Sequence, residues 1–214
     1  MKTHKTRKKL TKKFSHFIFD IDGVILNSKI NMKFSWNKTN AKLKLKKKFS
    51  EYFKNIGLPF PEILKKMNIK NNHKRIEQEY KKNSIKFVKK INLYKNIKEF
   101  ISHLDSKKIP YYIVTSKDRV RTKKFLYNYK IFPKTIHCPS VKFKGKPRPD
   151  LINHCIKINH INKKECCYVG DTEHDYSAAT KAKIKFIFAS YGYGEKKTKY
   201  KFIINKPEQL FKFV

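Results

Sequence analysis

Two pairs of aspartates are the residues of this chain best placed to do chemistry. Asp20 and Asp22 follow the apolar run at 17–19, and Asp171 and Asp175 follow the run at 166–169. The chain has only seven aspartates, so these two pairs account for most of them. Carboxylates brought together repel one another and raise one another's pKa unless a cation lies among them. Because Mg²⁺ prefers oxygen ligands, the two pairs predict a magnesium site.

Hydroxyl and ammonium groups suited to binding phosphate lie next to predicted strands and helices. Thr115 and Ser116 follow the apolar run at 111–114, where a hydroxyl and free backbone N–H groups could hold phosphate oxygens. Lys146 stands in the sequence Lys-Gly-Lys-Pro-Arg-Pro-Asp at 144–150, where glycine and two prolines restrict the backbone just before a predicted helix. This rigid setting distinguishes Lys146 from the other lysines.

Short apolar runs alternate with segments of helical spacing along most of the chain. The runs at 17–19, 111–114, 166–169 and 186–189 are typical of strands buried on both faces. Apolar residues recur at helical spacing over 94–104, 120–129 and 151–156. This alternation predicts an α/β fold with a Rossmann-like parallel sheet and helices on both faces. Such sheets bind ligands at the carboxyl ends of their strands, where the candidate residues lie.

The interval from 28 to 94 is too long for a simple crossover between two strands. It carries helical patterns of its own at 49–56, 63–67 and 76–88. We expect a small helical cap domain at 28–94, inserted after the first strand and lying over the carboxyl edge of the sheet. The α/β core domain is then expected at 15–27 and 95–214, and a basic mobile arm at 1–14.

The composition indicates a globular protein with an unusually cationic surface. Hydrophobic residues make up 39% of the chain, and 53 Lys and Arg face 16 Asp and Glu, for a formal charge of +37. Only five of these cations are arginine, and the lysines are spread along the chain. A sequence-reading nucleic-acid site would favour clustered arginine, so a solvated lysine surface that attracts a small anionic metabolite is the preferred interpretation. A nucleic-acid partner remains the alternative.

Nothing in the sequence indicates export or a membrane span. No apolar run approaches the length that a transmembrane helix needs, and no signal-peptide pattern follows the basic amino terminus. The four cysteines have no C-x-x-C spacing and are expected to be reduced thiols. The adjacent pairs His137-Cys138 and His154-Cys155 could together bind zinc, but adjacent ligands are poorly spaced for it, so a zinc site is disfavoured. We expect a cytoplasmic protein.

The order of these motifs resembles a known superfamily. Asp-x-Asp-Gly-Val at 20–24, Thr-Ser at 115–116, Gly-Lys-Pro-x-Pro-Asp at 145–150 and Gly-Asp-Thr-x-x-Asp at 170–175 are similar to the motifs of the haloacid dehalogenase superfamily of phosphatases. The resemblance is greatest to its phosphoglycolate-phosphatase-like branch and covers almost the whole chain after the arm. The insert resembles the helical cap of that branch.

The resemblance implies a role for each matching residue. Asp20 would be the nucleophile that forms an aspartyl-phosphate, and Asp22 the general acid that protonates the leaving alcohol and later activates water. Thr115 and the amide of Ser116 would bind the transferring phosphoryl group. Lys146 would neutralise its charge and orient the nucleophile.

The resemblance also implies a metal site and a reaction class. Asp171, the Asp20 carboxylate and the Asp22 carbonyl would bind Mg²⁺, with Asp175 supporting that ligand sphere. The acid at Asp22 disfavours dehalogenation, which has no alkoxide to protonate. The expected activity is therefore a Mg²⁺-dependent phosphatase acting on a small phosphomonoester. A sugar phosphomutase and a nucleic-acid-binding protein on the same scaffold are the alternatives.

Overall fold

The computed structural model describes residues 12–214 of the chain. The expected basic arm at 1–14 therefore lies mostly outside the described residues. Its last residue does not belong to an arm, because Phe14 is 4% exposed and its backbone N–H donates to the carbonyl of Phe213. The ring of Phe14 also packs against Phe17 and Phe202, so the folded core begins earlier than the sequence indicates.

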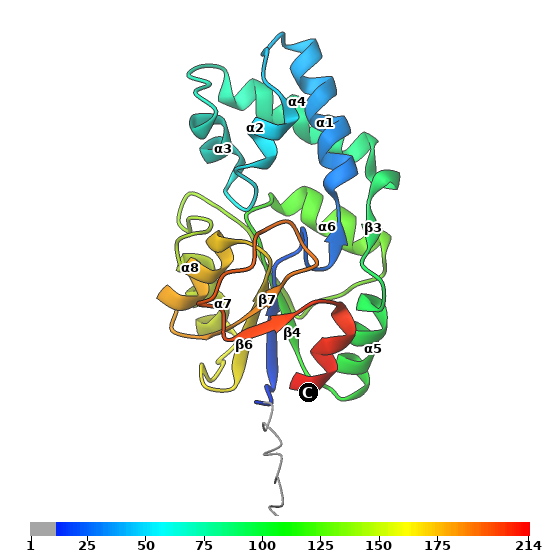
Figure 1. Cartoon of the computed structure of the whole chain (residues 1–214), viewed down its shortest axis with the longest axis vertical. Coiled ribbons are helices and arrows are strands. Elements are labelled where there is room, and N and C mark those ends of the chain that lie inside the picture. The colour runs from blue at the N-terminus through cyan, green and yellow to red at the C-terminus, as the bar shows by residue number, and fades with distance from the viewer. Residues whose placement is uncertain (1–11) are drawn as a thin grey trace, which may run out of the picture.

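The core is a six-stranded sheet in which every neighbouring pair is parallel, in the order β5-β4-β1-β6-β7-β8 (Figure 1). β1 lies between β4 and β6, so the chain reverses its direction of winding beside β1. This switch point is where an open α/β sheet forms its ligand crevice. The strands are β1 (His16–Phe19), β4 (Tyr111–Val114), β5 (Thr135–His137), β6 (Cys166–Gly170), β7 (Lys185–Ala189) and β8 (Phe202–Ile204).

Helices cover both faces of the sheet, as the sequence predicts. One apolar cluster joins Phe17 and Phe19 to α5, α6 and the 3₁₀-helix η2, and a second joins Ile18 to α7 and α8. Alternate side chains of β1 therefore enter opposite cores, which is the period of a strand buried on both faces. The helices are α5 (Ile97–Ser106), α6 (Arg119–Asn128), α7 (Asp150–Ile158), α8 (Glu173–Lys181) and η2 (Pro207–Phe213).

A helical insert separates β1 from α5. It leaves and rejoins the core through two short antiparallel strands, β2 (Leu26–Asn27) and β3 (Asn92–Leu93). Its elements are α1 (Lys29–Lys42), α2 (Phe49–Phe53), α3 (Phe60–Lys66), α4 (His73–Lys86) and η1 (Val88–Lys90). The insert has its own hydrophobic cluster around Trp36, Tyr52 and Tyr80, and it lies beyond the carboxyl ends of the strands (Figure 1). That it moves as a cap stays a prediction.

The helix α1 is absent from the sequence-based expectation for a clear physical reason. Its buried face is largely polar and includes Asn31, Ser35 and Thr39. Two of these side chains bond to α4: Asn31 Nδ2 donates to the Ser84 carbonyl at 2.9 Å, and Thr39 Oγ1 accepts from Asn83 Nδ2 at 3.2 Å. The Ser35 hydroxyl instead donates to the Asn31 carbonyl within α1. Only Met32 and Trp36 on this buried face are apolar, and two apolar residues are too few to reveal the helix by its periodicity.

The strands β5 and β8 lie outside the four expected runs. β5 has one aliphatic residue in three, whereas β8 is wholly apolar and is as short as the run at 17–19. None of the helices in the described part of the chain is both long and apolar enough to cross a membrane.

Candidate active site

Asp20 lies directly after β1, at the switch point of the sheet. Its side chain is almost fully buried, and Oδ1 lies 2.9 Å from the ammonium of Lys146. Burial raises the pKa of Asp20 to about 7, with the charges of Asp175 and Asp22 adding to the rise and Lys146 opposing it. Keeping the buried Asp20 carboxylate ionised therefore costs free energy unless a further cation lies nearby.

Lys146 connects the two acidic pairs. It comes from the loop before α7, is 2% exposed, and contacts Asp20 at 2.9 Å and Asp175 Oδ1 at 2.5 Å. Burial alone would lower the pKa of this lysine, but the two carboxylates raise it above its ordinary value, so the ammonium stays charged. The lysine selected by its Gly-Pro setting is thus an integral part of the site.

Asp175 is fully occupied by hydrogen bonds. Its Oδ1 accepts from Lys146 and from the hydroxyl of Tyr168 at 3.0 Å, and its Oδ2 accepts from the backbone N–H and hydroxyl of Thr172 at 2.9 and 2.6 Å. Thr172 is the N-cap of α8 and forms a capping box with Asp175. Although burial raises the pKa of Asp175, the charge and hydrogen bonds of Lys146 and Thr172 leave it below its usual value.

Asp171 presents the opposite case. Its Oδ2 accepts from the backbone N–H of Tyr193 at 2.7 Å, but Oδ1 is buried and has no hydrogen-bond partner among the described residues. Burial, followed by the charges of Asp175 and Asp20, raises the pKa of Asp171 well above normal. Gly23 approaches it closely with φ +82°, and a Cβ there would lie 1.9 Å from Oδ2. Only glycine fits beside this carboxylate.

The arrangement suits a hard divalent cation. One carboxylate oxygen from each of Asp20, Asp171 and Asp175 lies within 4.8 Å of the others. Because Asp175 is saturated by its neighbours, the oxygens best able to bind a metal directly belong to Asp20 and Asp171. An oxygen-only donor set with one buried, unpartnered carboxylate oxygen fits Mg²⁺ better than zinc.

The carboxylate of Asp22 does not join this group. Its Oδ1 accepts from the hydroxyl of Ser28 at 2.5 Å, and its Oδ2 lies 2.9 Å from the ammonium of Lys117. Lys117 is 8% exposed, and its ammonium lies 4.9 Å from the centre of the Phe125 ring. Burial lowers the pKa of this lysine, with Asp22 opposing the shift. Of the four predicted metal-binding aspartates, Asp22 therefore offers no side-chain ligand here.

A cavity between the core and the insert contains the predicted phosphate-binding residues. Thr115 and Ser116 line it together with Asp20, Asp22 and Lys146. The hydroxyl of Ser116 is buried without a hydrogen-bond partner in the described structure, so it is free to bond a ligand. The insert contributes a mostly apolar and aromatic wall, which comprises Met32, Tyr52, Ile56, Gly57, Leu58, Phe60, Ile63 and Tyr80.

The structure adds site residues that sequence reasoning missed. Lys117 was indistinguishable among the many lysines, although it follows Thr115-Ser116 directly. Arg121 is 5% exposed, pairs with Asp118 at 2.5 Å and lines the same cavity. Tyr193 joins core and insert, because its hydroxyl accepts from the Ser28 backbone N–H at 2.7 Å while its ring packs on Phe53. No signal in the sequence marks Arg121 or Tyr193.

The fold and this site define an α/β protein with a cluster of buried carboxylates at the carboxyl ends of its strands. The chain belongs to the haloacid dehalogenase-like hydrolase family, whose model matches residues 17–189. It is therefore a hydrolase of that family. A search of curated proteins finds no match to the sequence.

Solved structures share the fold at low sequence identity. A haloacid dehalogenase-like hydrolase from Streptococcus pneumoniae superimposes with a TM-score of 0.79 at 20% identity, over 92% of this chain and 97% of that one. A candidate phosphoglycolate phosphatase from Lactobacillus plantarum gives 0.84 at 18% identity, over 94% and 100%. CbbY from Rhodobacter sphaeroides, bound to xylulose-1,5-bisphosphate, gives 0.81 at 15%, over 92% and 96%.

Proposed function

We propose that this protein is a Mg²⁺-dependent phosphatase that hydrolyses a small phosphomonoester through an aspartyl-phosphate on Asp20. The observation that carries the proposal is that the Asp20 carboxylate lines the cavity, contacts the Lys146 ammonium and lies beside the carboxylates of Asp171 and Asp175. Phosphoryl transfer needs mainly positioning and charge neutralisation, which these residues supply. The phosphate-bearing sugar bound to CbbY is a ligand of the same chemical class.

The first step uses groups that already face the cavity. The substrate's phosphoryl oxygens bind the Thr115 hydroxyl, the free Ser116 hydroxyl and the Lys146 ammonium. An oxygen of Asp20 then attacks phosphorus, so that a new P–O bond forms to the carboxylate and the ester P–O bond breaks. The leaving alkoxide takes a proton from Asp22. Before this transfer the Asp22 carboxylate must take up a proton, which the Lys117 ammonium in contact with it can supply.

The second step returns the enzyme to its starting state. Asp22, now ionised, takes a proton from a water molecule as the water attacks the phosphorus of the aspartyl-phosphate. The bond between phosphorus and Asp20 breaks, and inorganic phosphate leaves. Mg²⁺ would be held by Asp20 and Asp171, with Asp175 fixing Lys146 beside them, and when bound it neutralises charge on the phosphoryl oxygens. The apolar wall of the insert excludes bulk water from the cavity.

Release of phosphate from para-nitrophenyl phosphate in the presence of Mg²⁺ tests the proposal. We expect activity in the wild type, none above background in Asp20→Asn, and no change in Asp105→Asn, an exposed aspartate far from the cavity. Chelation with EDTA should abolish the activity and added Mg²⁺ should restore it. Equal rates for wild type and Asp20→Asn would remove the assignment.

A further inference from the structure

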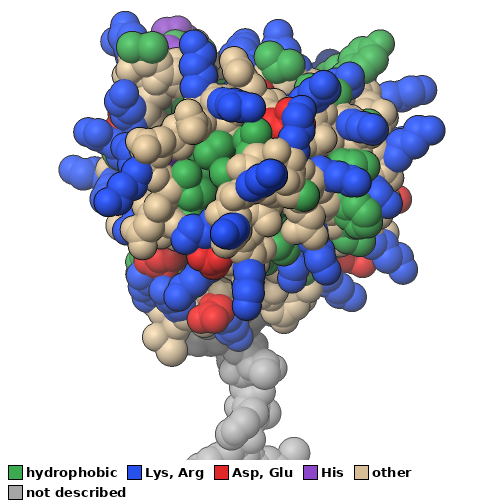
Figure 2. All heavy atoms as spheres, turned by 90° about the horizontal axis from the view of Figure 1, so that it is seen from above, with side chains coloured by type: hydrophobic (Ala, Val, Ile, Leu, Met, Phe, Trp, Pro, Cys, Tyr) green, Lys and Arg blue, Asp and Glu red, His purple; other side chains and the backbone are tan. Residues whose placement is uncertain are grey.

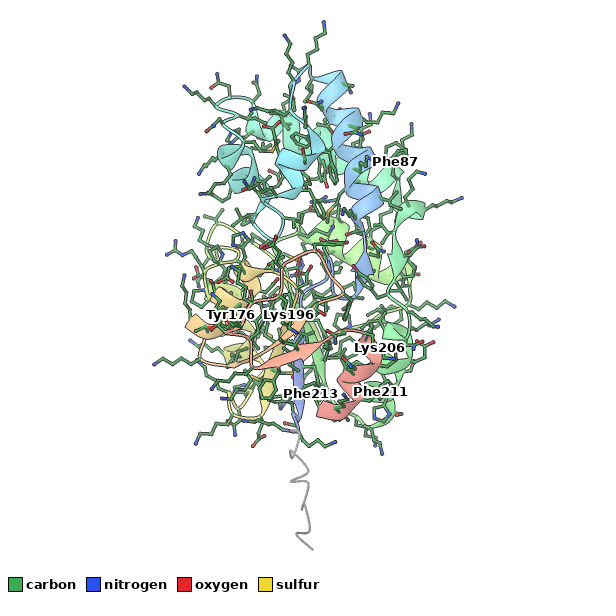
Figure 3. The ribbon with its side chains drawn as sticks, in the orientation of Figure 1. Phe87, Tyr176, Lys196, Lys206, Phe211 and Phe213 are labelled. Carbon is green, nitrogen blue, oxygen red and sulfur yellow. The ribbon has the colours of Figure 1, made fainter. Side chains whose placement is uncertain are left out.

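A second groove lies at the opposite end of the sheet from the acidic site. It is formed by the amino ends of β7 and β8, the loop before β6 and the last turns of α8. Figure 3 labels Tyr176, which reaches this groove from α8. None of its lining residues belongs to the cavity around Asp20. The groove and the proposed phosphatase site therefore share no lining residue.

Lysine dominates this groove far beyond its share of the chain. Seven of its twelve lining residues are lysine and none is acidic. On the face seen in Figure 2, by contrast, Lys and Arg side chains are interspersed with Asp and Glu. The seven come from four separate segments, so no charge run in the sequence produces the cluster. They are Lys12, Lys163, Lys164, Lys183, Lys185, Lys199 and Lys201.

Few of these charges are compensated within the described residues. Lys199 pairs with Glu173 at 2.5 Å, and the ammonium of Lys163 donates to the Ala182 carbonyl at 3.0 Å. The other five lysines form no ion pair with a described residue. Ammonium groups gathered in one groove repel one another, and an extended polyanion that contacts several of them relieves this repulsion while releasing its own counterions.

Aromatic rings lie between these charges. Tyr176 and Phe202 line the groove and are half-buried, and the Lys199 ammonium lies 4.5 Å from the centre of the Tyr176 ring. A basic groove with aromatic side chains is the chemistry that binds single-stranded nucleic acid, whose flexible backbone can follow a groove that a rigid duplex cannot enter. The groove has no arginine, so it lacks the bidentate donors that read bases.

We propose that this lysine groove binds single-stranded nucleic acid through its phosphates, without preference for sequence. The inference places the nucleic-acid alternative mainly on the folded domain, with Lys12 the one groove residue that comes from the basic segment at 1–14. It does not depend on phosphatase activity, since the groove and the acidic site lie at opposite ends of the strands.

Fluorescence anisotropy with a labelled 20-nucleotide oligouridine RNA tests the proposal on the full chain. The groove variant carries Lys164→Glu, Lys185→Glu and Lys201→Glu, and the control variant carries Lys33→Glu, Lys38→Glu and Lys98→Glu. All six lysines are exposed, and both variants change the net charge equally. At low salt we expect affinity to fall at least about 10-fold more in the groove variant than in the control. Its slope of log K against log salt should be shallower by about 2, because three phosphate contacts are lost.

Several outcomes would overturn the groove assignment. Equal losses in the two triple variants would mean that net charge alone drives binding. Loss on deletion of residues 1–11, with full binding retained by the groove variant, would place the site in the amino-terminal segment. Binding to phosphatidylserine vesicles without binding to the RNA would indicate a membrane surface instead. Unchanged circular dichroism and melting temperature of each variant show that the fold is intact.

Discussion

The ammonium of Lys117 lies 2.9 Å from Oδ2 of Asp22, and both side chains line the cavity between core and insert. The other oxygen of Asp22 accepts from Ser28, the residue immediately before α1. Asp22, the proposed general acid, therefore contacts both the loop after β4 and the start of the insert. A displacement of the insert relative to the core would alter one of these two contacts, which couples the position of Asp22 to the position of the insert.

The ion pair between Lys117 and Asp22 should show strong energetic coupling. Lys117→Met leaves a largely buried carboxylate without its cation, and we expect unfolding free energy to fall by about 3 kcal/mol. Asp22→Asn should be similarly destabilising, while the double variant should lose clearly less than the two single losses combined. Urea denaturation of all four proteins measures this cycle. Simple additivity would show that the pair contributes nothing as a unit.

Lys146 should be far more sensitive than its neighbour in the same loop. Lys146→Met removes the one cation among residues 12–214 that contacts both Asp20 and Asp175, and we expect kcat for phosphate release to fall about 100-fold or more. Lys144→Met, at an exposed position two residues earlier, should retain wild-type kcat. Comparable rates for the two variants would exclude Lys146 from the reaction.

Metal binding should be visible without any activity measurement. Magnesium in about 100-fold excess over its Kd should raise the melting temperature of the wild type by about 5 °C. Asp171→Asn should abolish this rise because it removes the buried carboxylate with the free oxygen. Without Mg²⁺ the variant should melt no lower than the wild type, since one of three mutually repelling carboxylates has gone. Asp105→Asn, at an exposed position, serves as the control.

His137 should make the fold sensitive to mild acid. The side chain is 4% exposed, and burial, with smaller contributions from His154 and Arg119, lowers its pKa from 6.5 to about 4. The unfolded chain therefore takes up a proton near pH 6.5 that the folded chain resists, so stability is lost as the pH falls from about 6.5 towards 4. His137→Asn should flatten the dependence of melting temperature on pH across this window. His160→Asn, at an exposed position, should leave that dependence unchanged.

The motif order and the apolar runs were enough to predict the strands whose carboxyl ends carry the candidate site residues. The expected strands at 17–19, 111–114, 166–169 and 186–189 correspond to β1, β4, β6 and β7, because strands buried on both faces must be continuously apolar. Lys146 was recognisable by its glycine and prolines. The edge strand β5 and the helix α1 were not recognisable, since β5 has one aliphatic residue in three and the buried face of α1 has only two apolar residues.

The sequence by itself determined the fold class and the edge of the sheet at which the aspartates lie, because each follows a strand and parallel strands bring their carboxyl ends to one edge. Only the tertiary structure decided what each carboxylate does there. Asp175 is saturated by Lys146, Thr172 and Tyr168, Asp171 keeps an unpartnered oxygen, and Asp22 turns to Lys117. The tertiary structure also brings lysines from four separate segments of the chain into one groove. Such partners depend on packing between elements remote in the chain, which local composition does not encode.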